Sequence, residues 1–394
     1  MSKINKSEQT APGQATRCVH TGTITEHGIN SPVYASSAFP YHPDQANVYP
    51  RYYNTANQEA VVQKICALEE AEAGLLFSSG MSAISSVILG LLQAGDHIIL
   101  QRDLYGGTMS FVTTELPRFG IAYTLIEEVT EASLREALQP ETRLIYLETP
   151  SNPLLHITDL SMVSRFARAN QVHTMIDNTF ASPINQQPVK LGIDIVIHSG
   201  TKYLGGHSDL IFGVAVSTRA IMQPILKYSI NSGGNINAQT CALIERSLKT
   251  LAVRVKQQNT NARALAEYLH SLPEIKQVNY PGLARGNERN YRLATEQMNG
   301  YGGMLSFELA DALAPELMNF LGNLKLATHA LSLGGVETLV CIPARTSHIK
   351  MTAEERAAAG ISDQLVRVSV GIEEVDDITE DFRQALAVLE PSKV

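Results

Sequence analysis

The sequence predicts an α/β protein with a mainly parallel central sheet and a smaller C-terminal α+β domain. The chain has 394 residues, more than one hydrophobic core usually accommodates, so two domains are expected. From about residue 55, short apolar runs alternate with helix-length segments, as strands joined by helical crossovers do. We therefore expect an N-terminal arm over 1–55, a large domain over 56–245 and a C-terminal domain over 246–394.

The large domain is expected to begin with an amphipathic helix. Thr55 and Gln58 resemble a capping box, apolar residues then recur at helical spacing, and Gly74 is expected to follow the last turn. The strands expected after this helix are Leu75–Phe77, His97–Leu100, Ala122–Ile126, Arg143–Leu147, Thr174–Ile176 and Asp194–Ile197. Because the carboxyl ends of parallel strands lie at one edge of a sheet, functional groups are expected there.

The second half is expected to begin with a long helical stretch over about 235–272, interpreted as a spine between the domains. Strands are then expected around Met304–Phe307 and Leu365–Val370, and helices around Pro315–Leu321 and Asp377–Leu389. This mixture indicates the smaller α+β domain.

Composition argues against several classes of protein. No run of about 18 apolar residues is present to span a bilayer, so no membrane partner is expected. The net charge is −8 and the basic residues are scattered, which argues against nucleic acid. Residues 1–17 lack the apolar segment of a secretory signal and are interpreted as a flexible arm. The cysteines form no C-x-x-C pair, so we expect buried thiols and a cytoplasmic location. The histidines form no H-x-x-x-H pair, so we expect no metal.

The most unusual segment is the glycine-rich run 197–209, which contains Lys202 and directly follows an expected strand. A lysine is more often a solvated surface residue. Here, however, it closely follows the hydroxyl residues Ser199 and Thr201, and the glycines give close access. A partly desolvated amine loses its proton readily, so Lys202 is a candidate to form a Schiff base with an aldehyde near a phosphate.

Asp177 closes the apolar run 172–176 and is a second candidate. An Asp-Asn turn is an equally good interpretation, because both residues favour turns. A buried carboxylate at a strand end, however, requires a partner. Against a pyridine ring it would keep the ring nitrogen protonated, and the ring would then act as an electron sink.

Two further segments carry weaker patterns. Residues 75–83 indicate a strand, a turn and the start of a helix, where the N–H groups of Gly80 and Met81 would favour a phosphate. An ordinary strand-to-helix turn is the alternative. Tyr105 precedes two glycines and either stacks on a flat ring or packs in the core.

The order of these motifs resembles the Cys/Met-metabolism family of pyridoxal-phosphate (PLP) enzymes, over about Thr16 to Ile378. The resemblance rests on the Lys202 run and on the segments 31–39, 49–54, 148–153, 332–339 and 366–372. It implies an aminotransferase-like fold (fold type I), a pyridoxal 5′-phosphate cofactor, a small amino-acid substrate and a homotetramer built from two active dimers.

The resemblance also implies the roles of the site residues. Lys202 holds the cofactor, Asp177 meets its ring nitrogen and Tyr105 stacks on its ring; Lys202 and Tyr105 are the expected catalytic residues. The expected phosphate ligands are Gly80, Met81, Ser199 and Thr201, with Tyr49 and Arg51 from the N-terminal arm of a neighbouring subunit. The expected ligands of the substrate α-carboxylate are Asn152, Ser332 and Arg367. An arginine offers a planar pair of donors for such a group, although isolated arginines are usually surface residues in ion pairs.

Three positions bear on the reaction. Methionine γ-lyases generally have a cysteine where this chain has Gly107. Many cystathionine synthases and lyases have an arginine within the segment that is here Thr108–Phe111, and often a glutamate at the position of Leu331.

We favour a lyase that cleaves a C–S bond of cystathionine or a related thioether or thiol amino acid by β- or γ-elimination. The alternatives are γ-replacement on an O-acyl homoserine, as in cystathionine γ-synthases and sulfhydrylases, and a scaffold protein without activity.

Overall fold

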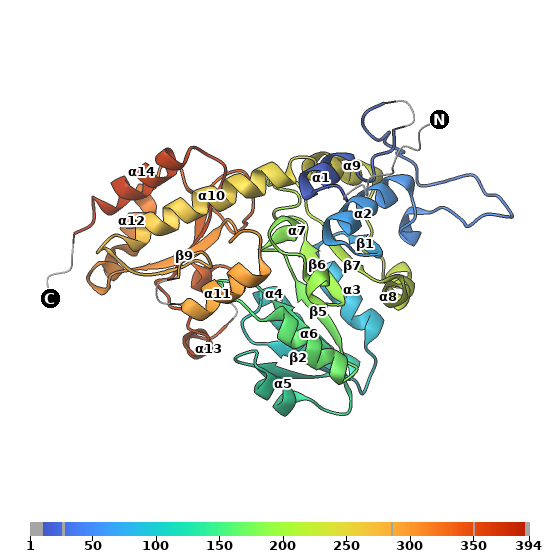
Figure 1. Cartoon of the computed structure of the whole chain (residues 1–394), viewed down its shortest axis with the longest axis horizontal. Coiled ribbons are helices and arrows are strands. Elements are labelled where there is room, and N and C mark those ends of the chain that lie inside the picture. Colours follow the sequence, from blue (N-terminus) through green and yellow to red (C-terminus); the bar gives the residue numbers. More distant parts are fainter. Residues whose placement is uncertain (1–10, 26–27, 285–286, 350, 391–394) are drawn as a thin grey trace, which may run out of the picture.

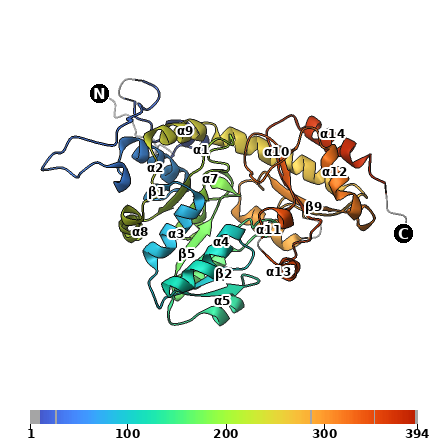
Figure 2. The same ribbon diagram turned by 180° about the vertical axis from the view of Figure 1, so that it is seen from behind.

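The computed structural model describes residues 11–25, 28–284, 287–349 and 351–390. Figures 1 and 2 show, from opposite sides, two sheets with the long helix α10 (Leu251–His270) running across from one to the other. The N-terminal segment projects beyond the first sheet, and the second sheet lies at the opposite end of the molecule.

The first sheet is mainly parallel, as the sequence predicts. Its strands follow the order β1-β7-β6-β5-β4-β2-β3, and β7 is antiparallel to both of its neighbours. The strands are β1 (Ala73–Phe77), β2 (His97–Gln101), β3 (Ala122–Ile126), β4 (Thr142–Glu148), β5 (His173–Asp177), β6 (Ile195–Ser199) and β7 (Gly213–Ser217). The six strands expected from the sequence are present, and β7 is an addition to them.

Apolar side chains bury both faces of this sheet. Along β4, Ile145 and Leu147 belong to one apolar cluster, whereas Leu144 and Tyr146 belong to another, as the alternation of a strand requires. The first cluster also contains side chains from the helices α2 (Ala56–Glu69), α6 (Leu160–Ala169) and α9 (Ala238–Leu248). The second cluster also contains side chains from the helices α3 (Gly80–Leu91) and α8 (Arg219–Ser232). Polar groups at the strand ends are therefore the part of the sheet that remains open to a ligand.

The second sheet has the order β10-β11-β12-β9-β8 and packs against α10, α12 (Leu317–Asn323) and α14 (Val375–Leu386). Its strands are β8 (Ile275–Asn279), β9 (Met304–Leu309), β10 (Thr328–His329), β11 (Leu339–Cys341) and β12 (Val366–Ser369). Phe307, Phe320 and Phe382 meet in its core, with ring centroids 5.9–6.2 Å apart. The expected strands near 304 and 366 are confirmed, and so are the helices that follow each of them.

The end of the first large helix differs from the expectation. The capping box is present, with the Thr55 N–H donating to Gln58 Oε1 at 3.1 Å. The helix, however, ends at Glu69, and Glu70 takes the left-handed conformation at φ 60°. Gly74 lies inside β1, where a Cβ would lie 2.8 Å from Val216 Cγ1. This glycine therefore allows strand packing and does not end the helix.

The N-terminal interpretation is also partly wrong. A flexible arm was expected over 1–17, but Gln14–His20 forms helix α1, whose Cys18 is buried. Arg17 fixes this helix by donating to the Ala67 carbonyl at 2.7 Å. Residues 1–10 of the expected arm lie outside the described part of the chain.

The expected single spine over 235–272 consists of two helices, α9 and α10, separated at Lys249 and Thr250. The expected domain boundary at 245 falls within α9, and we retain the division at 55 and 245 as a proposal. All four cysteines are free and buried. No helix in the described ranges is both long enough and apolar enough to cross a membrane.

Candidate active site

A cavity of about 570 Å³ opens at the carboxyl ends of β4, β5 and β6, a volume typical of sites for cofactors and small ligands. Ten of the twelve site residues expected from the sequence line this cavity: Gly80, Met81, Tyr105, Asn152, Asp177, Ser199, Thr201, Lys202, Ser332 and Arg367. They come from both sheets and from the loops between the strands and helices. The fold thus brings together segments that are more than 280 residues apart in the sequence.

One wall of the cavity is the N-terminus of α3. Ser79 caps this helix by accepting the Ser82 N–H at 3.1 Å, and the first N–H groups of a helix have no acceptor within it. A Cβ on Gly80 would lie 2.8 Å from Ser199 Cβ, so only glycine allows the helix to approach the strand end so closely. Donors at a positive helix end, next to the Ser199 and Thr201 hydroxyl groups, fit the phosphate of PLP.

Lys202 lies in the turn after β6, where its N–H donates to the Ser199 carbonyl at 3.1 Å. Its Nζ donates to Ser332 Oγ at 3.1 Å. Burial, and secondarily the positive charge of Arg367, lower the pKa of Lys202 to about 8. A much larger fraction of this amine is therefore unprotonated at neutral pH than for a solvated lysine, which suits attack on an aldehyde.

Asp177 ends β5 and is 7% exposed. The hydroxyl and the N–H of Thr179 both donate to its Oδ1, the N–H at 3.0 Å. Burial raises the pKa of Asp177, while the Thr179 donors and His198 lower it. Among the described residues these contacts leave Oδ2 for a ligand. A buried carboxylate that lacks a cation at one oxygen fits the protonated ring nitrogen of PLP.

Arg367 lies in β12 and is 3% exposed. Its Nη1 donates to Asn152 Oδ1 at 3.1 Å, and Nη2 lies 3.4 Å from the carbonyls of Leu331 and Ser332. Among the described residues no carboxylate lies within ion-pair distance of this guanidinium. Because an unpaired buried cation is costly, the site has a place for an anionic group such as a substrate carboxylate.

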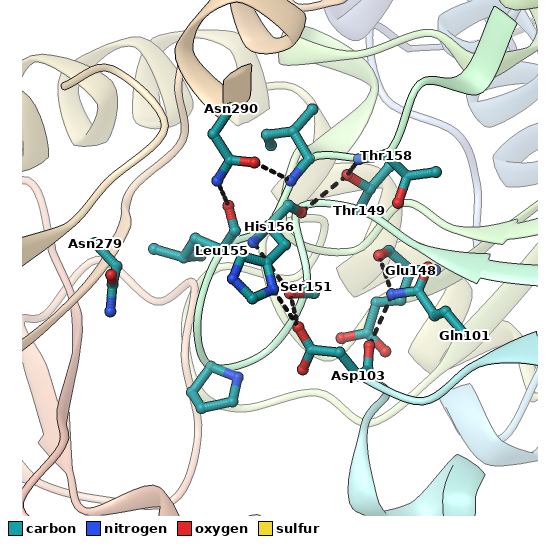
Figure 3. A network of polar contacts seen from close by, with 12 residues as sticks. Gln101, Asp103, Glu148, Thr149, Ser151, Leu155, His156, Thr158, Asn279 and Asn290 are labelled. Carbon is teal, nitrogen blue, oxygen red and sulfur yellow. Dashed lines mark hydrogen bonds and ion pairs between the residues drawn. The ribbon is translucent and has the colours of Figure 1, made fainter. Parts of the chain in front are cut away.

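The loop that carries Asn152 is fixed by the polar network in Figure 3. Gln101 holds the end of β4 by donating to the Glu148 carbonyl at 2.7 Å and accepting its N–H at 3.1 Å. Asp103 Oδ2 accepts a hydrogen bond from the Ser151 hydroxyl and lies 3.1 Å from Nδ1 of the His156 ring. Asn290 donates to the Leu155 carbonyl from another part of the chain. Asn152 therefore contacts Arg367 from a loop that is held by hydrogen bonds to other parts of the chain.

Tyr49 and Arg51 do not line this cavity. Arg51 lies in a short turn (Pro50–Tyr52), donates to the Ile230 carbonyl at 2.7 Å and stacks over Tyr49 and Tyr52, with ring distances of 5.8 and 5.5 Å. Whether they reach the cavity of a neighbouring subunit stays a prediction.

Several lining residues were not identified from the sequence. Glu148 ends β4 directly beside Asp177 in the sheet register, and its Oε2 accepts the Tyr105 N–H at 2.9 Å. Burial and the neighbouring Asp177 raise the pKa of Glu148 well above its usual range. Two adjacent strands each end in an acidic residue, and this pattern was a signal that could have identified Glu148. Ser347 and Ile349 come from a loop without a motif, and nothing local marks them.

Comparison with known proteins identifies the family of the chain. The family model for Cys/Met metabolism PLP-dependent enzymes matches residues 15–387. The chain is 41% identical to a cystathionine γ-lyase of Bacillus subtilis, with 93% of this chain and 96% of the relative covered. It is 40% identical to a cystathionine β-lyase of Lactococcus lactis, with 94% and 98% covered. A cystathionine γ-synthase of Xanthomonas oryzae pv. oryzae, solved in complex with cystathionine, superposes with a TM-score of 0.91 at 36% identity, covering 96% of this chain and 98% of that one. The aminotransferase-like fold and the dependence on PLP are thereby confirmed, and the chain belongs to the Cys/Met metabolism family of PLP-dependent enzymes.

Proposed function

We propose that this chain is a carbon–sulfur lyase that cleaves cystathionine or a related thioether or thiol amino acid. The observation that carries the proposal is one cavity in which a lysine with a lowered pKa faces a buried aspartate and a buried, unpaired arginine: Lys202, Asp177 and Arg367. Relatives at 41% and 40% identity that bear the names of lyases support elimination over replacement.

When bound, PLP supplies an electron sink for the negative charge that develops at the substrate Cα. The chain's residues do the rest. Asp177 would hold the ring nitrogen, Tyr105 would stack on the ring, and Arg367 with Asn152 would orient the substrate carboxylate. Lys202 would hold the cofactor, and its Nζ would take the α-proton of the substrate. Ser332 Oγ, 3.1 Å from Nζ, is positioned to direct that amine.

The mouth of the cavity supports a thioether substrate. Ile211, Leu331 and Ile349 line it and are 68%, 69% and 65% exposed. The basic lining residues among those described are Lys202 and Arg367, which we assign to the reacting end. An uncharged sulfur-containing arm would contact these apolar side chains favourably. A distal carboxylate, as in cystathionine, would need a partner from outside this cavity lining, such as a neighbouring subunit.

The second candidate is γ-replacement on an O-acyl homoserine, which the structural likeness to a cystathionine γ-synthase supports. A lyase releases a keto acid and ammonia, whereas a synthase excludes water until a thiol adds. Purified enzyme should be incubated with cystathionine, cysteine, homocysteine, methionine and O-acyl homoserines, with and without added thiol. Keto acid from cystathionine, with little thiol adduct from the homoserine esters, supports the lyase. The reverse product pattern would refute it in favour of the synthase.

We also propose a cytoplasmic homotetramer built from two active dimers. The N-terminal arm exposes apolar side chains in the single chain, with Ile29 89% and Tyr41 72% exposed. A second subunit that covers them would gain stability from their burial. Light scattering coupled to size-exclusion chromatography should give four times the chain mass of 42.9 kDa. A monomer mass at assay concentration would contradict this assembly.

A further inference from the structure

A buried acid–base pair lies behind the cavity and has no part in the chemistry described above. Glu69, the last residue of α2, is fully buried, and His198 of β6 is 1% exposed. His198 Nε2 lies 2.5 Å from Glu69 Oε1. Glu69 Oε1 also accepts Asn178 Nδ2 at 3.1 Å, while Glu69 Oε2 has no hydrogen-bond partner among the described residues.

The environment of Glu69 favours a charged pair. A buried carboxylate requires a compensating cation, and the basic group that contacts it here is the His198 ring. The other contact, from Asn178, is a neutral donor that suits a carboxylate acceptor. A short contact between an imidazolium and a carboxylate satisfies both ions, because each supplies the charge that the other lacks.

This pair is adjacent to Asp177. Asp177 lies opposite Ile197 in the parallel pairing of β5 with β6, so His198 is the next residue along the neighbouring strand. Asn178, which contacts Glu69, follows Asp177 directly and donates its N–H to the Ile197 carbonyl at 2.9 Å. Burial raises the pKa of Asp177, whereas the two Thr179 donors and, after them, the positive charge of His198 lower it. On α2, Cys66 is a further titratable group close enough to Glu69 for the charge of Glu69 to act on it. On β4, Glu148 lies close to Asp177.

We propose that Glu69 and His198 form a positioning pair for the cofactor: Glu69 holds His198 as an imidazolium behind Asp177, and this charge keeps Asp177 ionised toward the ring nitrogen. The inference rests on the assignment of Asp177 to that nitrogen, but not on the choice between lyase and synthase. Neither Glu69 nor His198 lines the cavity, so the pair acts through Asp177.

The test replaces each member by a neutral residue of similar shape, in Glu69→Gln and His198→Gln. Removing the charge behind Asp177 would weaken the contact of this carboxylate with the ring nitrogen, and therefore the binding of PLP. We expect a PLP dissociation constant raised about tenfold or more in both variants, and a lowered kcat with little change in KM for the holoenzyme. PLP affinity, measured by fluorescence titration of the apoenzyme, needs no substrate and so is independent of the reaction assigned.

Asp381→Asn is the matched control. Asp381 is a buried carboxyl in α14 that accepts the N–H groups of Lys325, Leu326 and Ala327 at 2.7, 3.0 and 2.9 Å, and it does not line the cavity. This variant should lower the melting temperature but leave PLP affinity unchanged. If Glu69→Gln and His198→Gln behave as this control does, the pair is merely structural and the proposal fails.

A measurement on the unmutated protein guards against variants that do not fold. The nitrogen chemical shifts of the histidine side chains at pH 7.5 should include one imidazolium ring that persists in the holoenzyme and is shielded from solvent exchange. If every buried histidine ring is neutral, His198 does not carry the proposed charge.

Discussion

Replacing Arg367 by lysine keeps a positive charge in the proposed carboxylate site but removes the planar pair of donors. In the structure, Nη1 donates to Asn152 Oδ1 at 3.1 Å while Nη2 lies 3.4 Å from two carbonyls. A lysine ammonium would reach one of these positions and would present a single nitrogen to a carboxylate. The variant should therefore hold the substrate less tightly and orient its α-proton less well.

The size of the effect follows from the contact that is lost. A hydrogen bond between charged groups contributes about 1.5–3 kcal/mol, which corresponds to about ten- to hundredfold in kcat/KM. Arg367 is 3% exposed, so water cannot fully replace the missing donor. Poorer orientation of the α-proton would add to the loss.

The assay compares Arg367→Lys with the parent in kcat/KM for the best amino-acid substrate and in PLP dissociation constant. Arg383→Lys, at an exposed ion pair with Glu380, is the control and should match the parent in both. We expect a ten- to hundredfold loss in kcat/KM for Arg367→Lys with PLP affinity near that of the parent. A variant that loses PLP but turns over normally once loaded would refute the assignment of Arg367 to the substrate.

Three further outcomes are expected. Gly80→Ala should weaken PLP binding about tenfold or more, because the added Cβ would lie 2.8 Å from Ser199 Cβ; Gly322→Ala should not, because its Cβ would meet no atom within 4 Å apart from its chain neighbours and its own helix backbone. Equal affinities of the two variants by fluorescence titration would contradict the phosphate cradle. Because burial lowers the pKa of Lys202 to about 8, the unfolded apoenzyme binds more protons than the folded one between about pH 8 and 10.5, and the free energy of unfolding should rise with pH across that window. Denaturant melts of Lys202→Met should show a weaker dependence of this free energy on pH, and identical slopes would contradict the lowered pKa. Mixed oligomers of Arg51→Ala and Lys202→Ala chains should recover part of the activity if Arg51 serves a neighbouring site, and no recovery despite proven subunit exchange would exclude that role.

Much of the fold could be predicted because the strands of the first sheet are short apolar runs bounded by helix-length segments. The prediction failed where a local signal had two meanings. Gly74 was interpreted as a helix end, but it lies in β1 against Val216, a contact between residues far apart in the sequence. Strand β7 (Gly213–Ser217) follows the Lys202 run without a helix between them, so a pattern of alternating strands and helices does not predict it.

The cavity residues with motifs around them were found from the sequence, since glycine-rich turns and polar strand ends are local signals. Ser347 and Ile349 were missed because only the tertiary fold brings their loop to the cavity. The pair formed by Glu69 and His198 was missed for the same reason: the two residues are 129 positions apart, and each alone resembles an ordinary charged or polar side chain.

The central claim is that Lys202 carries the cofactor, and reductive labelling tests it most directly. Borohydride treatment of the holoenzyme fixes PLP to the lysine that binds its aldehyde carbon, and mass spectrometry of the peptides then identifies that lysine. We predict the pyridoxyl-phosphate mass on the peptide that contains Lys202, and its absence in Lys202→Ala, which should also lack turnover while keeping the fold of the parent by circular dichroism. A label on another lysine, or an active Lys202→Ala enzyme, would contradict the account.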